Sequence, residues 1–333
     1  MKSKKLVMVL GCVSFIFVAG VVPFKLVYAQ KTEINWSSFV PKEYPSVDVV
    51  VRGFMDRATQ LAKGELVFKY RGGPETIAAF DQGKAVQKGI VDLSLVPIGF
   101  YEPLAPGIGA AMLTQISLEE ERKPGGAYDY LNELHKKGGL FYLGRGLPVD
   151  EFFTLNLSKR LEKPKDFVGT RIGTLTATHA CTTAWGATAV SLSMPEVYSA
   201  MERKLVDGVS CLPLWDVVTT GVYEVTKYSI DHGYYYNTVA VIMNLDKWKK
   251  IPKHLQDLII KSMILSEKDT QVWANEYKKK AREKMVKAGV EFYKLSPEVD
   301  KWFIETAYNA AWESQQKKFP EVTQKLRELF LKK

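Results

Sequence analysis

The chain has 333 residues, a formal net charge of +9 and 46% hydrophobic residues, enough for two domains with hydrophobic cores. Its lysines cluster on the polar faces of expected helices, as at 278–280 and 317–318. This distribution is typical of a solvated surface and argues against a nucleic-acid partner.

Residues 1–29 have the pattern of a secretory signal peptide. Three lysines in the first five residues precede an apolar run at 6–22, and Val-Tyr-Ala at 27–29 fits a small-x-small cleavage site. We expect cleavage after Ala29, which removes four lysines and no acid and so lowers the net charge from +9 to +5. The mature chain is then expected to be periplasmic. A retained membrane anchor, or lipid attachment through Cys12, is the alternative.

Catalytic chemistry finds little support in the sequence, so we expect neither an enzyme nor a bound cofactor or metal. The four histidines lack metal-ligand spacing, and neither Cys-x-x-Cys nor Gly-x-Ser-x-Gly is present. A secreted hydrolase with Glu75 and Glu151 as paired carboxylates is the alternative from the enzyme class. Cys181 and Cys211 are too few for a disulfide framework, and whether they pair stays open.

The first part of the mature chain predicts a largely parallel sheet, because strand and helix patterns alternate. A turn at 71–75 is expected to open a helix that contains Ile77, Phe80 and Val86. Strand patterns at 138–147 and 152–157 then lead out of this first lobe. The other expected elements of this part are strands at 32–36, 66–70 and 90–96 and a helix at 46–62.

The second part of the chain also alternates strand and helix patterns, and the chain then returns to the first lobe. A β-type run at 234–244 is suited to carrying the chain back to the first lobe. Residues 253–288 contain neither Gly nor Pro, and a continuous helix there would be roughly 54 Å long and lie across both lobes. Two shorter helices are the alternative. The other expected elements are strands at 169–174 and 209–212 and helices at 178–185, 194–203, 297–319 and 320–331.

Two stretches of the sequence resemble each other. Residues 85–97 (AVQKGIVDLSLVP) and 200–213 (AMERKLVDGVSCLP) each combine a helix end, a Val-Asp pair and an apolar strand that ends at proline. One supersecondary unit used twice predicts two matching lobes. Strand ends that face each other would form a cleft, and open α/β sheets bind small ligands at the carboxyl ends of their strands.

The predicted fold class is therefore α/β, a two-lobed periplasmic-binding-protein-like fold with hinge strands and a long helix spanning both lobes. We expect lobe I to comprise residues 30–149 plus 238–262. Lobe II is expected to comprise residues 150–237 plus 263–333. No low-complexity linker separates the lobes, which indicates a hinge of ordered strands.

Several segments resemble the DctP-type extracytoplasmic solute-binding proteins of tripartite ATP-independent periplasmic (TRAP) transporters. These segments are GGPET (72–76), GIVDLSLVP (89–97), DFVGTRIGTL (166–175), residues 186–208 and YEVTKY (223–228). The resemblance implies two α/β domains, a ligand trapped between them, and delivery to the small and large permease components of the membrane, driven by an ion gradient. An ABC-type receptor and a sensor-coupled receptor are the alternatives.

The resemblance also implies arginines that bind the ligand carboxylate, and this chain departs from that pattern. Gly173 stands at the position of one family arginine, and Glu151 at that of a second. A glutamate would repel a carboxylate. Arg171, on the same face of the strand as Gly173, and Arg145, between two glycines, are the candidates to replace them.

The remaining site candidates follow the expected ends of strands, where they would form an aromatic-walled pocket with a few polar groups. We expect a small organic acid with an apolar or aromatic body as the ligand. A neutral or cationic solute matched to Glu151 and Glu75 is the alternative. These remaining candidates are Trp36, Phe39, Glu75, Phe100, Tyr101, Trp185, Trp215, Tyr236 and Asn237.

Overall fold

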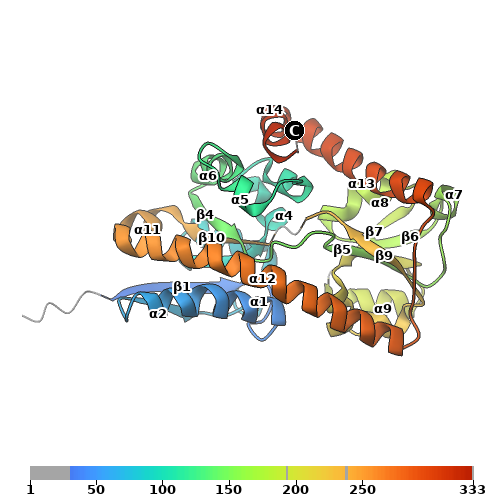
Figure 1. Ribbon diagram of the computed structural model, residues 1–333, viewed down its shortest axis with the longest axis horizontal. Coiled ribbons are helices and arrows are strands. Elements are labelled where there is room, and N and C mark those ends of the chain that lie inside the picture. The colour runs from blue at the N-terminus through green and yellow to red at the C-terminus, as the bar shows by residue number, and fades with distance from the viewer. Residues whose placement is uncertain (1–30, 193, 237–238, 332–333) are drawn as a thin grey trace, which may run out of the picture. The chain divides into compact units, whose positions relative to one another are not determined.

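The computed structural model describes residues 31–192, 194–236 and 239–331 (Figure 1). The expected signal peptide and the site candidate Asn237 lie outside the described residues. The described residues belong to one compact unit, Lys31–Lys333. No helix among them is long and apolar enough to cross a membrane.

Five strands form the first sheet, in the order β2-β1-β3-β10-β4. β1 pairs in parallel with β2 and β3, whereas β10 runs antiparallel between β3 and β4. All of these strands except β10 therefore end at the same edge, where β10 begins. The strands are β1 (Thr32–Ser38), β2 (Leu66–Tyr70), β3 (Leu93–Pro97), β4 (Leu140–Arg145) and β10 (Val239–Asn244).

Six strands form the second sheet, in the order β11-β9-β5-β8-β6-β7. Here β5 is the strand that runs antiparallel between two others, β8 and β9. β6 pairs in parallel with β7 and β8. The strands are β5 (Phe153–Leu157), β6 (Arg171–Thr174), β7 (Thr188–Ser191), β8 (Gly208–Leu212), β9 (Tyr228–Tyr234) and β11 (Glu291–Tyr293). Each sheet thus contains one reversed strand among parallel ones.

Helices surround both sheets (Figure 1). The predicted helix at 46–62 is one continuous helical stretch whose middle, Val51–Asp56, is a π-helix. The first half of the chain contributes α1 (Pro45–Val50), α2 (Arg57–Leu61), α3 (Gln82–Gln87), α4 (Ile98–Tyr101), α5 (Leu118–Glu121) and α6 (Ala127–Lys137). The second half contributes α7 (Pro164–Phe167), α8 (His179–Ala184), α9 (Val197–Glu202), α10 (Leu214–Thr219), α11 (Leu245–Lys250), α12 (Lys253–Lys287), α13 (Pro297–Lys318) and α14 (Pro320–Phe330).

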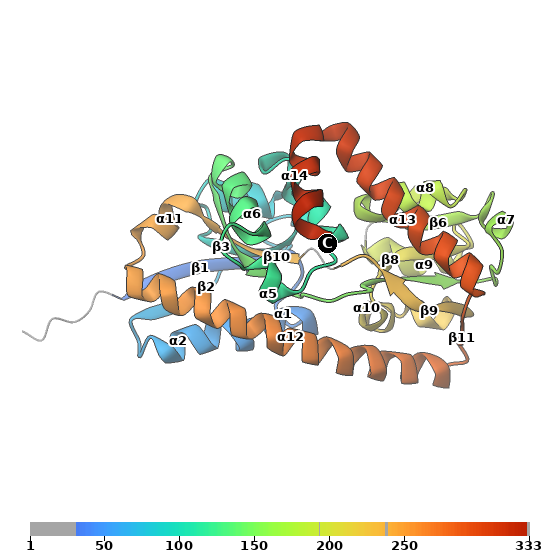
Figure 2. The same ribbon diagram turned by 45° about the horizontal axis from the view of Figure 1, so that its top comes forward.

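The long helix predicted at 253–288 is confirmed. α12 is a continuous helix of 35 residues. It passes both α1, next to the first sheet, and α10, which follows a strand of the second (Figure 2). Near its middle Asp269 pairs with Arg57 of α2 at 2.7 Å, and further along Arg282 pairs with Asp231 of β9. The helix therefore ties the two sheets together.

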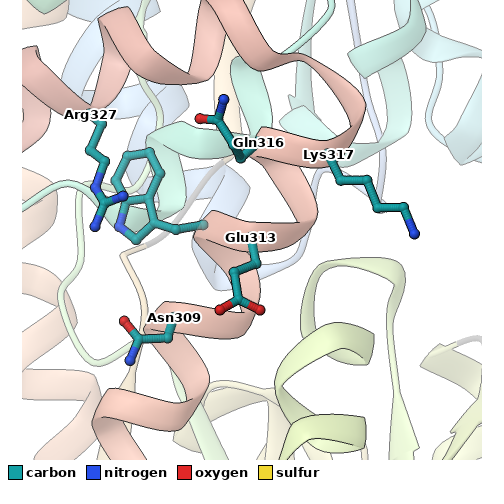
Figure 3. A pocket seen from close by; sticks show the side chains of 6 residues that line it. Asn309, Glu313, Gln316, Lys317 and Arg327 are labelled. Carbon is teal, nitrogen blue, oxygen red and sulfur yellow. The ribbon is translucent and has the colours of Figure 1, made fainter.

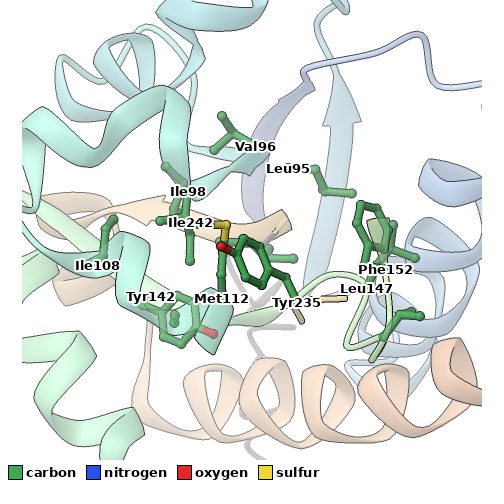
Figure 4. Close-up of a cluster of buried hydrophobic side chains, with 14 of the residues drawn as sticks. Leu95, Val96, Ile98, Ile108, Met112, Tyr142, Leu147, Phe152, Tyr235 and Ile242 are labelled. Carbon is green, nitrogen blue, oxygen red and sulfur yellow. The ribbon is translucent and has the colours of Figure 1, made fainter. Parts of the chain in front are cut away.

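Two extended crossings join the sheets, each from carboxyl edge to carboxyl edge. β4 ends at Arg145 and β5 begins at Phe153, whereas β9 ends at Tyr234 and β10 begins at Val239. The two crossings lie side by side, because the Phe152 amide donates to the Tyr235 carbonyl at 3.0 Å. Leu147, Phe152 and Tyr235 from these crossings join the buried core beside strand β3 (Figure 4).

The two similar sequence stretches form equivalent structures, as predicted. Each is a helix followed by a strand: α3 leads to β3 in one sheet and α9 to β8 in the other. Asp92 accepts from the backbone amide of Asn35 at 2.8 Å, and Asp207 accepts from that of Arg171 at the same distance. In both sheets this aspartate locks the entering strand to its parallel neighbour.

Three local predictions need correction or completion. The turn at 71–75 does not open the helix directly, because a short 3-10 helix at Ala79–Asp81 precedes α3 and leaves Ile77 outside it. The run at 234–244 is not one strand, since Tyr234 ends β9 and a separate strand, β10, begins at Val239. Cys181 and Cys211 are both free thiols and both buried.

Candidate functional site

The carboxyl edge of the first sheet carries an aromatic cluster, defined here as Phe39, Phe80 and Phe100. The Phe39 and Phe100 rings lie 6.3 Å apart edge to face, and the Phe80 ring lies 4.2 Å from that of Phe100. Phe80 is 61% exposed. Phe39 and Phe100 were predicted as site residues. Phe80 was missed, because the sequence placed it on the face of a longer helix.

Glu75 belongs to the turn beside this cluster. Its carboxylate accepts the Gly73 amide at 2.6 Å, and this bond holds the pKa of the exposed Glu75 below its ordinary value. A Cβ at Gly73 would lie 2.8 Å from the Glu75 carboxylate and 2.9 Å from the Tyr70 hydroxyl, so a larger residue there would displace these side-chain ends. Glu75 is therefore ionised and directed at its own turn.

The carboxyl edge of the second sheet leads directly into α10, which begins with Leu214, Trp215 and Asp216. Trp215 is 4% exposed and packs edge to face against Phe152 of the first crossing and Trp273 of α12. Its indole N–H has no hydrogen-bond acceptor in the described part of the chain. A buried donor without a partner is uncommon and calls for an explanation.

Asp216, next along α10, was not predicted. Its side chain is partly buried, and within the described ranges it has neither an ion pair nor a hydrogen bond. Burial raises the pKa of its carboxyl to about 7. Burial also raises the pKa of Tyr44, which precedes α1, and the charge of Asp216 adds to that rise.

Gly173 lies in the middle of β6, and its neighbours explain the glycine. A Cβ at this position would approach Leu192 Cδ1 to 2.6 Å and Val209 Cγ1 to 3.0 Å. Aliphatic side chains thus fill the space into which a residue at position 173 would project. A long side chain here would require Leu192 to move.

Arg145 ends β4 at the first crossing and is 1% exposed. Its guanidinium pairs with Glu121 at 2.8 Å, donates to the Ala111 carbonyl at 3.3 Å and lies over the Tyr236 ring. Burial disfavours the charged form, but the Glu121 carboxylate outweighs it and keeps the pKa of Arg145 above its ordinary value. The charge of Arg145 is thus neutralised inside the protein.

Arg171 begins β6, at the edge opposite to the carboxyl ends. Its guanidinium lies 3.4 Å from the Asp207 carboxylate and donates to the Lys204 carbonyl at 2.9 Å. Its side chain is exposed. The strand therefore separates Arg171 from the Trp215 and Asp216 end of the sheet, and its contact with a ligand stays a prediction.

Glu151 and Tyr236 belong to the two crossings. Glu151 is exposed and has a φ of 48°, in the left-handed region that favours glycine, as has Tyr235 with 62°. The Tyr236 amide donates to the Met112 carbonyl at 2.9 Å. Each crossing thus contains one residue in a conformation that costs free energy, and packing must hold it there.

Three predicted site aromatics are core residues. Trp36 packs against Tyr70 with ring centroids 4.7 Å apart, and the Tyr101 hydroxyl lies 3.0 Å from His135 Nε2. Trp185 stacks on Phe303 at 4.2 Å and donates its indole N–H to the Phe303 carbonyl. The contacts described for these three side chains are with other residues of the protein, as is usual for buried aromatic side chains.

A hollow of about 350 Å³ lies elsewhere, on the surface of α13 and α14 (Figure 3). Arg327 lies over the Trp312 ring, and the other polar side chains of the hollow come from α13. None of the predicted site residues lines it. Within the described residues, no group of three or more His, Cys, Asp or Glu side chains is arranged to hold a metal ion.

Comparison with known proteins identifies the family. Residues 36–318 match the model of the bacterial extracellular solute-binding proteins, family 7, also called DctP. The chain belongs to this family. The C4-dicarboxylate-binding periplasmic protein DctP of Rhodobacter capsulatus is 29% identical over 188 residues, which are 55% of this chain and 52% of the relative. The chain thus spans about half or less of the curated relatives that it matches.

Solved structures of family members share the two-lobed α/β fold. One is a TRAP periplasmic solute-binding protein from Desulfovibrio salexigens with bound orotic acid (TM-score 0.78, 20% identity, 90% of this chain and 97% of that one). Another, from Haemophilus influenzae with bound L-gulonate, has a TM-score of 0.73 at 20% identity and covers 90% of this chain and 100% of that one. The fold class predicted from the sequence is therefore confirmed.

Proposed function

We propose that this chain is the extracytoplasmic receptor of a TRAP transporter and that it captures a small organic acid between its two sheets. The observation that supports this most is the pair of crossings that join carboxyl edge to carboxyl edge, with α12 spanning both sheets. In open α/β sheets such edges are where ligands bind. Solved relatives that hold orotic acid and L-gulonate support an organic acid as the solute.

The proposed receptor has two lobes, 30–149 plus 238–262 and 150–237 plus 263–333, a division that the strand membership of the two sheets supports. Binding stabilises a closed arrangement by as much as the solute prefers it over the open one. The receptor is a carrier and not an enzyme. It is exported after cleavage at Ala29 and then delivers its solute to the small and large permease components.

A neutral or cationic solute is the second candidate, and three observations favour it. Aliphatic side chains fill the space beside Gly173. Glu121 neutralises Arg145. Glu151, the other predicted site residue of the first crossing, is itself an acid. The fork of arginines that the family resemblance implies for a carboxylate is thus not formed by these residues.

Two measurements test the proposed function. Titration calorimetry of the exported protein with monocarboxylates and dicarboxylates is expected to find at least one ligand. In vesicles that contain the small and large components of a TRAP permease, uptake of that ligand is expected to require the receptor and an ion gradient. Uptake driven by ATP would contradict the TRAP assignment and favour an ABC-type receptor. An adjacent histidine kinase without permease genes would favour a sensor-coupled receptor.

A further inference from the structure

Asp216 is an acid for which the described fold supplies no counter-charge. It lies at the start of α10, where the chain leaves β8, and its side chain is partly buried. The two fully buried acids of the described chain, Glu121 and Glu267, each pair with an arginine, at 2.8 and 2.7 Å. Removing a carboxylate from water without a partner costs free energy, and a bound cation would recover it.

The residue next to Asp216 belongs to an aromatic cluster drawn from distant segments. Trp215 packs edge to face against Phe152 of the first crossing and Trp273 of α12. Burial raises the pKa of Tyr44, in the segment after β1, and the charge of Asp216 adds to that rise. Aromatic side chains beside a carboxylate are a setting that attracts organic cations.

The polar groups near α10 also include the indole N–H of Trp215, which is buried and has no acceptor within the described residues. Folding thus leaves one acceptor, the Asp216 carboxylate, and one donor, the Trp215 N–H, without partners at neighbouring positions. This matches a ligand that supplies both a donor and an acceptor.

We propose that Asp216 recognises a protonated amine of the solute, so that the receptor binds amine-bearing organic solutes, zwitterionic acids among them. This inference rests on the proposed function, because it assigns a solute class to the same inter-sheet site. The ammonium donates to the Asp216 carboxylate, and an acceptor on the solute receives the Trp215 N–H. The arginines at 145 and 171 keep their partners in the protein throughout.

Matched compounds test the proposal. The exported protein is screened at pH 7.5 by thermal shift against sets that share a carbon skeleton and differ only in charge: acid, zwitterion, amine and alcohol. One set is 3-phenylpropionate, phenylalanine, phenethylamine and 2-phenylethanol, and aliphatic sets of three to six carbons are built in the same way. Amine-bearing members are expected to raise the melting temperature by several degrees near saturation, and their amine-free counterparts are not.

The substitution Asp216→Asn then tests whether Asp216 is the residue that binds the amine. The substitution keeps the side-chain shape and removes a charge that has no partner, so the protein is expected to fold. Affinity for each amine hit is expected to fall at least about tenfold, which is what loss of one charge-assisted bond gives. Glu224→Gln, a matched change at an exposed acid of the following 3-10 helix Val222–Val225, is expected to leave affinity within about twofold.

The outcomes separate this inference from the proposed function. Hits confined to amine-free acids overturn the role of Asp216 and leave the proposed receptor function intact. Amine hits whose affinity Asp216→Asn does not change also overturn it. Absence of any hit in all sets overturns both. Amine hits that Asp216→Asn weakens and Glu224→Gln does not support both.

Discussion

The first sheet is flanked by two largely buried ion pairs, whereas the second leads into an acid that has no partner among the described residues. Beside the first sheet, Arg122 holds Glu267 with two hydrogen bonds, of 2.9 and 2.7 Å, and Arg145 holds Glu121. After the second sheet, Asp216 has no such partner within the described chain. The difference indicates that the paired acids serve the fold, while the unpaired one is left for a molecule from outside.

The geometry around Glu267 shows how far the first arrangement is built in. Glu267 Oε1 also accepts the Arg145 amide at 2.9 Å, so α12 is bonded to the end of β4 where the first crossing begins. A Cβ at Gly144, whose φ is 157°, would collide with both the Glu267 carboxylate and the Arg122 guanidinium. The glycine is therefore required for the ion pair to approach the strand.

The largest effect is expected from Glu267→Gln. The substitution leaves the buried Arg122 guanidinium without its carboxylate and should lower the free energy of unfolding by about 3 kcal/mol. Urea unfolding measures it. Asp48→Asn, which breaks the exposed pair of Asp48 and Arg52, is the control and should cost less than about 0.5 kcal/mol. Equal losses of unfolding free energy in both variants would show that the buried pair contributes no more to stability than the exposed one.

The second largest effect on stability is expected from Gly173→Arg. The new side chain must displace Leu192, so we expect a loss of about 1–3 kcal/mol from overpacking, measured by the same unfolding experiment. Adding Leu192→Ala is expected to recover part of this loss by making room. If the single variant is as stable as the natural chain, the space beside β6 is open and the packing argument fails.

Asp216→Asn should change the pH dependence of stability in the empty protein. Because the carboxyl has a pKa of about 7 when folded and about 3.8 when unfolded, the folded state binds the proton more tightly. The Asp216 contribution is therefore present below pH 4 and is lost as the pH rises through 7. As the pH rises from 4 to 7, we expect the free energy of unfolding of the natural chain to fall by about 1–2 kcal/mol relative to that of Asp216→Asn. The effect is no larger because water still reaches the side chain.

Melting curves between pH 4 and pH 8 measure this effect. The difference between the natural chain and Asp216→Asn should grow with pH up to about 7 and then stay constant. Glu224→Gln provides the baseline for removal of an exposed acid. A difference that does not depend on pH would mean that Asp216 has an ordinary pKa and a counter-charge.

The smallest effect is expected from Arg171→Ala. The Arg171 and Asp207 side chains both retain solvent contact, so the free energy of unfolding should change by less than about 1 kcal/mol. Because Arg171 lies at the amino end of β6, ligand affinity measured by calorimetry should stay the same. A large loss of affinity for a carboxylate would instead support Arg171 as the ligand-binding arginine expected from the sequence.

Much of the fold was predictable because its signals are local. The repeated Val-Asp before an apolar strand marks Asp92 and Asp207, which make the same backbone bonds in the two sheets. The absence of Gly and Pro from 253–288 marks α12. The separate strands β9 and β10 were harder, since β-prone residues, the tyrosines at 234–236 and the aliphatic residues at 239–243, flank the break on both sides.

The site was less predictable, because burial and pairing depend on residues far apart in the chain. From the sequence, Arg145 was a candidate to bind a ligand carboxylate, but in the fold its guanidinium forms an ion pair with Glu121. Trp36 and Trp185 are core residues. In the sequence, an aromatic residue of the core looks the same as one that lines a pocket. Asp216 gave no signal at all, since an aspartate in the first turn of a helix is ordinary.

The most direct measurement is the pKa of Asp216 by carbon-13 NMR of the exported protein labelled at its aspartate carboxyls, with Asp216→Asn to assign the signal. A pKa near 7 is expected in the empty protein. The pKa should fall by at least about 2 when a saturating amine-bearing ligand binds, because an ammonium favours the carboxylate. A pKa near 4 in the empty protein, or one that does not fall on binding, would show that Asp216 does not bind an amine.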